Sequence, residues 1–124
     1  ALKKSGLEPK DIQILELHDC FTPAEIIALE GMGFFEWGKA ADAVEDGQVD
    51  IGVKIPTNMS GGLIGKGHPI GATGASQVCM IVEQMRGNAP KGNQVDPVPE
   101  TGMTDTMGGS FGTLSHIVLG RSRR

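Results

Sequence analysis

Two short stretches of this sequence carry side chains that could take part in chemistry. In "HDCF" at residues 18–21, His18 and Cys20 follow directly on an apolar run. In "GKGHPIGATG" at residues 65–74, His68 stands among glycines just before a predicted helix. Histidine exchanges protons near neutral pH, and a cysteine thiolate is a strong nucleophile. Both stretches are therefore candidates for a catalytic site.

The glycines around His68 suggest a specific backbone shape. Gly65 and Gly67 permit conformations that other residues resist, and Pro69 fixes the chain direction after the histidine. The pattern predicts that His68 is held at a helix N-terminus, where backbone amides suit an anion or oxyanion. The alternative is an ordinary glycine-rich turn with an exposed histidine.

Cys20 lies between a predicted strand and a predicted helix. Residues 12–18 read as a buried strand. A capping box then predicts a helix that ends near Gly31, with Thr22 as N-cap, Pro23 at the first helical position and Glu25. Such strand ends hold the chemistry of many α/β folds, and a helix N-terminus favours a thiolate. The alternative makes Cys20 a small buried hydrophobe and His18 a core histidine.

The remaining elements follow from apolar periodicity. We expect helices at about Glu36–Asp46 and at Gly71–Met85, and a pair of strands around a glycine-rich bend within residues 103–119. Residues 50–60 should be extended, and residues 95–99 make a doubtful edge strand. Cys79 should face the core, and His116 should be structural. Together, these strands and helices predict one α/β layered domain over residues 1–124.

Composition narrows the setting of the protein. The net charge of −4 argues against a nucleic-acid surface, and no apolar run is long enough for a membrane span. Two cysteines are too few for a disulfide framework, which favours a reducing, cytoplasmic location. "ALKKSG" at the start reads as the last turn of a helix, so we expect the chain to be part of something longer.

Taken together, the two stretches resemble the thiolase superfamily. "NMSGGLIGKGHPIGATG" is similar to its C-terminal signature, through Asn58, Gly61, Gly62, Gly67, His68, Pro69, Gly71, Thr73 and Gly74. "ELHDCF" resembles the other catalytic loop as found in sterol-carrier-protein-type thiolases. The resemblance implies the C-terminal half of a thiolase fold, with a mixed β-sheet layered with helices.

The resemblance also implies a mechanism and partners. The substrate would be a coenzyme A thioester, with no bound cofactor and no metal site. The nucleophilic cysteine of the family lies in its N-terminal half, which this chain lacks. That missing half would be a partner, in a homo-oligomer that is a dimer or a tetramer.

Roles within this chain carry over by position in the family motifs. His68 would activate the nucleophile and form an oxyanion hole, which His18 would complete or orient. Asn58 would support the loop. Substrate-binding positions would be Gly61, Gly62, Gly67 and Pro69.

The sequence departs from many thiolases near its C-terminus. In "TMGGSFG", Thr106 stands where the family often has a proton-shuttling cysteine, while Gly108 could still supply an oxyanion-hole amide. Cys20 would then supply the acid–base thiol. Two alternatives stay open: a thiolase-like aldolase that cleaves β-hydroxyacyl-CoA side chains with a zinc-ribbon/OB-fold partner, and a non-catalytic acyl-CoA-binding subunit.

Overall fold

A three-stranded mixed sheet forms the centre of the protein in the computed structural model, which describes residues 1–109 and 111–121. Strand β1 (Leu15–Glu16) runs parallel to β2 (Thr101–Gly108), and β3 (Thr113–Gly120) pairs antiparallel with β2. Thr57 adds a parallel bridge to Leu15 on the other side of β1. The predicted pair of strands around a glycine-rich bend is confirmed as the β2–β3 hairpin.

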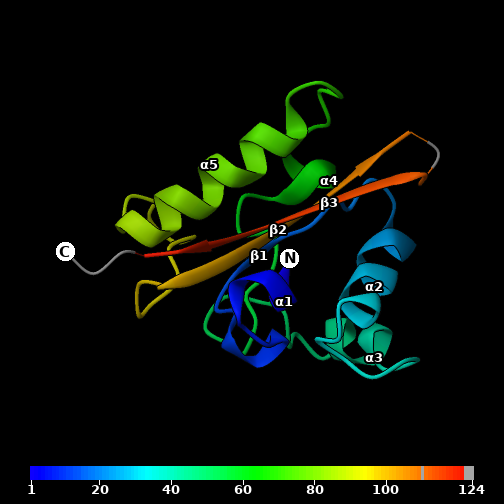
Figure 1. The fold of residues 1–124 in the computed structure, drawn as a ribbon. Helices are drawn as coiled ribbons and strands as arrows, with labels where there is room; N and C mark the ends of the chain where they lie inside the picture. Colours follow the sequence, from blue (N-terminus) through cyan, green and yellow to red (C-terminus); the bar gives the residue numbers. More distant parts are fainter. Residues whose placement is uncertain (110, 122–124) are drawn as a thin grey trace.

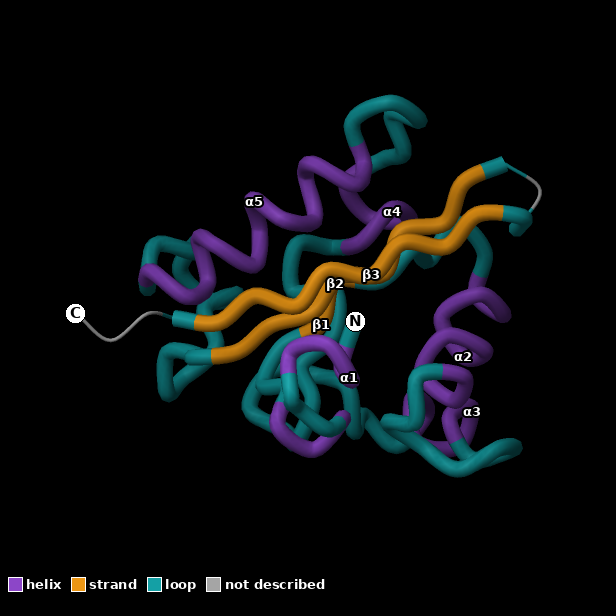
Figure 2. Tube along the Cα trace, in the orientation of Figure 1, coloured by secondary structure: helices purple, strands orange, loops and turns teal. Residues whose placement is uncertain are grey.

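Helices cover both faces of this sheet (Figure 1). Figure 2 shows α4 (Gly62–Lys66) and α5 (Thr73–Arg86) on one side, with α1 (Leu2–Ser5), α2 (Thr22–Gly31) and α3 (Ala40–Glu45) on the other. A single 3₁₀ turn, Pro9–Asp11, joins α1 to the segment that leads into β1. The mixed α/β, layered fold expected from the sequence is confirmed.

The core has one cluster on each face because alternate residues of a strand point to opposite sides. Leu15 and Leu17 pack with Met103 and Leu29 on the α2 side. Ile14 packs with Ile81, Met85 and Val95 under α5. Gly102 permits the close approach of α5, since a Cβ there would lie 2.5 Å from Cγ2 of Ile81.

Several local predictions are corrected by the structure. The N-cap of α2 is Phe21, with no side-chain cap, so the predicted capping box at Thr22 is wrong. Only Leu15–Glu16 of the predicted strand over 12–18 is assigned to the sheet, although the Gln13 amide donates to the Thr101 carbonyl and the Ile14 carbonyl accepts from the Met103 amide. The predicted Glu36–Asp46 helix is limited to Ala40–Glu45. Cys79 is exposed rather than in the core, since it lies on the outer face of α5.

Two further segments differ from expectation. Residues 95–99 form no strand, and the sequence did not predict the short helix α4 before His68. The end of α1 matches its prediction, since Gly6 closes it in a left-handed conformation with φ of 73°. In the described part of the chain, no helix has the length and apolar character needed to cross a membrane.

Candidate active site

The structure brings together the two histidines that the sequence selected. The rings of His18 and His68 meet edge to face, with their centroids 4.9 Å apart and their planes at 89°. His18 follows β1 and is 5% exposed, whereas His68 is exposed in the turn between α4 and α5. One ring is thus fixed in the fold and the other faces outward.

A hydroxyl group orients the ring of His68. Nδ1 of His68 lies 2.8 Å from Oγ1 of the buried Thr73, and this hydroxyl donates to the Pro69 carbonyl at 3.1 Å. Because its only hydrogen is used there, Oγ1 accepts from Nδ1–H of the histidine. This assignment of the tautomer leaves the Nε2 lone pair free to act as a base. His68 lies in the turn before the N-cap Ala72 rather than in the first turn of α5.

His18 is an imidazole that the fold keeps largely uncharged. Burial lowers its pKa from the ordinary value, and the neighbouring His68 lowers it further, while Asp105 and Asp19 act in the opposite direction. Its Nδ1 is buried without a hydrogen-bond partner among the described residues. A neutral ring can still present an N–H group to an oxyanion.

Asp19 ties the two signature loops together, a role that the sequence did not predict. Its carboxylate accepts hydrogen bonds from the amides of Leu63, at 2.7 Å, and Ile64, at 3.4 Å. Gly62, with φ of 60°, leaves room for this contact, since a Cβ there would lie 2.6 Å from Cγ of Asp19. The only signal in the sequence is an acidic residue next to His18. The structure thus gives Gly62 a packing role, and its substrate-binding role stays a prediction.

Asn58 fixes the end of β1. Its Oδ1 accepts a 2.7 Å hydrogen bond from the amide of Leu17, and its backbone is left-handed with φ of 55°. Its Nδ2 is buried and has no partner in the described chain. The predicted role of Asn58 in supporting the catalytic loop stays a prediction.

A buried carboxylate supports the segment that leads to His68. Glu16, 1% exposed, accepts hydrogen bonds from the amide and hydroxyl of Ser60 at 3.1 and 2.6 Å, and Lys66 lies 3.5 Å from it. Burial raises the pKa of Glu16, although Ser60 and Lys66 both act to lower it. Sequence reasoning missed this group because Glu16 reads as a polar interruption in a strand.

The other predicted residues are placed as follows in the fold. Cys20 is a half-buried free thiol just before α2. Thr106 donates its hydroxyl hydrogen to Oε1 of Gln77 in α5 at 2.5 Å, and Nε2 of Gln77 donates to the Asp105 carbonyl at 2.8 Å.

Gly108 lies at the end of β2, in register with Thr113. Gly61 and Gly67, with φ of 93° and 97°, flank α4, and Pro69 begins the turn after His68.

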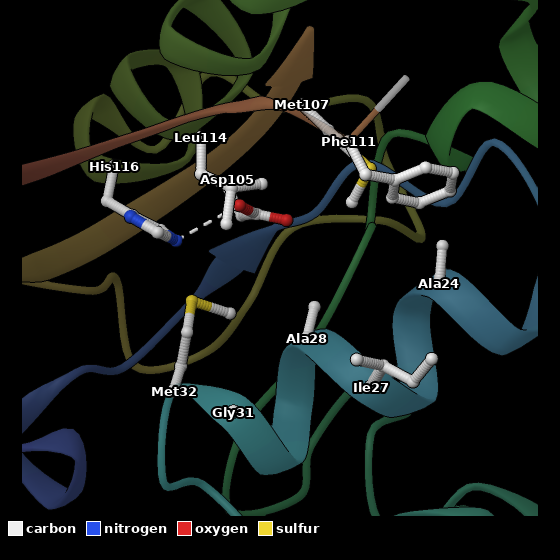
Figure 3. A pocket seen from close by; sticks show the side chains of 10 residues that line it. All are labelled: Ala24, Ile27, Ala28, Gly31, Met32, Asp105, Met107, Phe111, Leu114 and His116. Atoms are coloured by element: carbon white, nitrogen blue, oxygen red, sulfur yellow. Dashed lines mark ion pairs between the residues drawn. The ribbon is translucent and has the colours of Figure 1, made fainter. Parts of the chain in front are cut away.

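An apolar pocket of about 230 Å³ lies on the other face of the sheet, between α2 and the β2–β3 hairpin (Figure 3). Ile27, Phe111 and Leu114 are among its walls. At its edge His116 Nε2 lies 3.1 Å from Oδ1 of the buried Asp105. The residues predicted for the site do not line this pocket.

Comparison with known proteins agrees with this geometry. The family model described as "Thiolase C-terminal domain-like" matches residues 1–121. The chain is 46% identical over 121 residues to an acetyl-CoA acetyltransferase of Methanothermobacter thermautotrophicus, covering 98% of this chain and 31% of that protein. It is 47% identical over 89 residues to human sterol carrier protein 2, covering 72% and 16%.

A third relative and a solved structure complete the comparison. Benzoylsuccinyl-CoA thiolase subunit BbsB of Thauera aromatica is 43% identical over 107 residues, covering 86% of this chain and 28% of the relative. The Ltp2-ChsH2(DUF35) aldolase superposes with a TM-score of 0.85 at 32% identity, covering 98% and 30%. The chain therefore spans about a third or less of the length of these proteins. With both signature loops in place around the paired histidines, the chain belongs to the thiolase C-terminal domain-like family.

Proposed function

We propose that this chain is the C-terminal catalytic half of an acyl-CoA thiolase, which cleaves 3-oxoacyl-CoA with coenzyme A or runs the reverse condensation. The observation that carries the proposal is the contact between the His18 and His68 rings, 4.9 Å between centroids, on the two signature loops. Two imidazoles at one point can supply both a base and a hydrogen-bond donor.

In the cleavage direction, a cysteine of the N-terminal half attacks the C3 carbonyl of the substrate. His68 takes the thiol proton through Nε2, the nitrogen left free by Thr73. The C2–C3 bond then breaks, the acyl group stays on the cysteine, and the carbanion at C2 accepts a proton to give acetyl-CoA. The thiol of a second coenzyme A takes the acyl group in the last step.

Oxyanions form at the thioester and carbonyl oxygens along this path. His18 would donate a hydrogen bond to one of them, and an amide near Gly108 would serve another. Each well-placed donor at such an oxygen is worth about 3 kcal/mol. Cys20 would supply the proton for C2, because the Thr106 hydroxyl is already bonded to Gln77 and a hydroxyl exchanges protons poorly near neutral pH.

An aldolase is the second candidate, supported by the likeness to the Ltp2-ChsH2(DUF35) aldolase and by Thr106 in place of a cysteine. In that case the complete protein would cleave a β-hydroxyacyl-CoA and would need a zinc-ribbon/OB-fold partner. In either case we propose a cytoplasmic homo-oligomer, a dimer or tetramer, that includes the N-terminal half.

The test measures acetoacetyl-CoA cleavage by the complete protein, with and without free coenzyme A. A thiolase consumes the substrate only when coenzyme A is present. Release of an aldehyde or ketone from a β-hydroxyacyl-CoA, with no thiolysis, would favour the aldolase. The 124-residue chain alone should show no turnover, since it lacks the acyl-carrying cysteine, and turnover above buffer would refute that assignment.

A further inference from the structure

The side chain of Lys66 anchors the glycine-rich stretch that leads into His68. Gly65 and Gly67 flank this lysine and have no side chains of their own, and Ile64 before them is 65% exposed. Gly67 ends α4 with φ of 97°, a conformation that other residues resist. Because glycines allow many backbone conformations, an anchor close to His68 is needed to hold its ring in one place.

The anchor is a network of three side chains at the end of β1. Nζ of Lys66 donates a 2.8 Å hydrogen bond to Oγ of Ser60 and lies 3.5 Å from Oε2 of Glu16. The Ser60 hydroxyl donates in turn to Oε2 of Glu16 at 2.6 Å, and it accepts from the amide of Gly62 at 3.3 Å. The side chain of Lys66 is 22% exposed and that of Glu16 is 1% exposed. The ammonium group therefore reaches from the surface to a buried carboxylate.

Two carboxylates of one segment thus hold the two ends of α4. Asp19 accepts a hydrogen bond from the amide of Leu63 in the first turn, and Glu16 pairs with Lys66 at the last residue. A helix of five residues is not stable through its own hydrogen bonds, so contacts with the rest of the fold must set the position of α4. His68 follows two residues after the end that Glu16 holds.

We propose that Lys66 is a positioning residue for His68, acting through its ion pair with Glu16. The pair keeps the Gly67 turn in one conformation, and this holds the His68 ring edge to face with the ring of His18. The use of that ring in catalysis rests on the function proposed above. Its placement can be measured whether or not the protein is a thiolase.

The test compares Lys66→Met with Lys66→Arg in the complete protein. Methionine removes the charge and the donor, whereas arginine keeps both. In Lys66→Met, kcat for acetoacetyl-CoA thiolysis should fall about tenfold with little change in KM, because a displaced base still allows the substrate to bind. Crystal structures should show the 4.9 Å separation of the His18 and His68 rings kept in Lys66→Arg and changed by about 1 Å or more in Lys66→Met.

Two further variants separate positioning from general damage. Lys91→Met is the matched control, because Lys91 is an exposed lysine that also precedes a left-handed glycine, Gly92 with φ of 96°. It should leave both kcat and the ring separation unchanged. The double variant Glu16→Gln/Lys66→Met removes both charges, so that no buried carboxylate is left without its counter-ion. It should fold and be as slow as Lys66→Met, because the tie to the Gly67 turn is still missing.

The ring separation and kcat together decide the outcome. A wild-type separation in Lys66→Met would overturn the proposal and show that the contact with Thr73 is enough to hold the His68 ring. Wild-type kcat in the double variant would also overturn it, because the loss would then come from the stranded carboxylate. If Lys66→Met does not fold, the double variant decides by the same two measurements.

The same measurements distinguish this proposal from the proposed function. A displaced His68 ring in Lys66→Met, in a protein whose wild type shows no thiolysis, would reject the proposed function and keep the positioning role. An undisplaced ring in an active thiolase would do the reverse.

Discussion

The carboxylate of Asp19 accepts a 2.7 Å hydrogen bond from the backbone amide of Leu63, which joins the loop after β1 to the first turn of α4. His18 lies in the first of these segments, and His68 follows the end of α4, so the contact ties the loop of one histidine to the short helix that precedes the other. It depends on the absence of a side chain at Gly62, where a Cβ would overlap the carboxylate.

Gly62→Ala should therefore destabilise the fold by about 2 kcal/mol or more, from the overlap with Asp19 and from the left-handed backbone. Gly65→Ala in the same short helix is the matched control, because a Cβ there meets nothing within 4 Å. Urea unfolding measures both variants. Equal stability for the two would show that Asp19 can move aside without cost.

His68→Ala in the complete protein should lower the rate of acyl transfer by about 10²-fold or more while the fold persists. The ring is exposed, so its loss removes little packing. Ile70→Ala, 88% exposed in the same turn, serves as the control for non-specific loop effects. Steady-state kinetics and circular dichroism test this. An unfolded variant, or one with wild-type rate, would make His68 a structural residue.

Cys20→Ala should lower activity roughly a hundredfold more than Thr106→Ala, because a thiol exchanges protons near neutrality and a hydroxyl does not. Thr106 also has its hydrogen committed to Gln77. Thiolysis rates of the two variants of the complete protein decide the matter. Comparable losses would return Cys20 to the role of a small packing residue and favour the aldolase.

Glu16→Gln should change how stability depends on pH. Burial raises the folded-state pKa of Glu16 above its ordinary value of 4.5, so the stability that it contributes is complete below that value and is lost as pH rises through the raised pKa. The wild type should therefore lose stability relative to the variant as pH rises from 4.5 toward neutrality. Urea unfolding at several pH values measures this. A wild type that gains on the variant would mean that Lys66 and Ser60 outweigh burial.

The sequence was most informative where a local rule determines the structure. Apolar spacing located α5, predicted at Gly71–Met85 and found at Thr73–Arg86, and the glycine-rich bend located the β2–β3 hairpin. Family resemblance placed His18 and His68 on two loops of one site, and their rings do meet.

The errors arose at a helix boundary and where contacts distant in sequence decide the outcome. The Thr22 cap failed because the helix begins one residue earlier than the pattern suggests, at a Phe21 that has no capping side chain. Asp19 and Glu16 were missed since their partners, Leu63 and Ser60, lie 44 residues away along the chain. Sequence patterns of period 2 or 3.6 contain no information about such pairs.

Gln77 affects the motions of the site as well as its shape. It is fully buried, and both ends of its amide are engaged by β2, through the Asp105 carbonyl and the Thr106 hydroxyl. For α5 to slide along β2, both hydrogen bonds must break at once inside the core, which places this junction among the slowest parts of the molecule to open. The N-terminal half of α5 is therefore expected to move together with the β2–β3 hairpin.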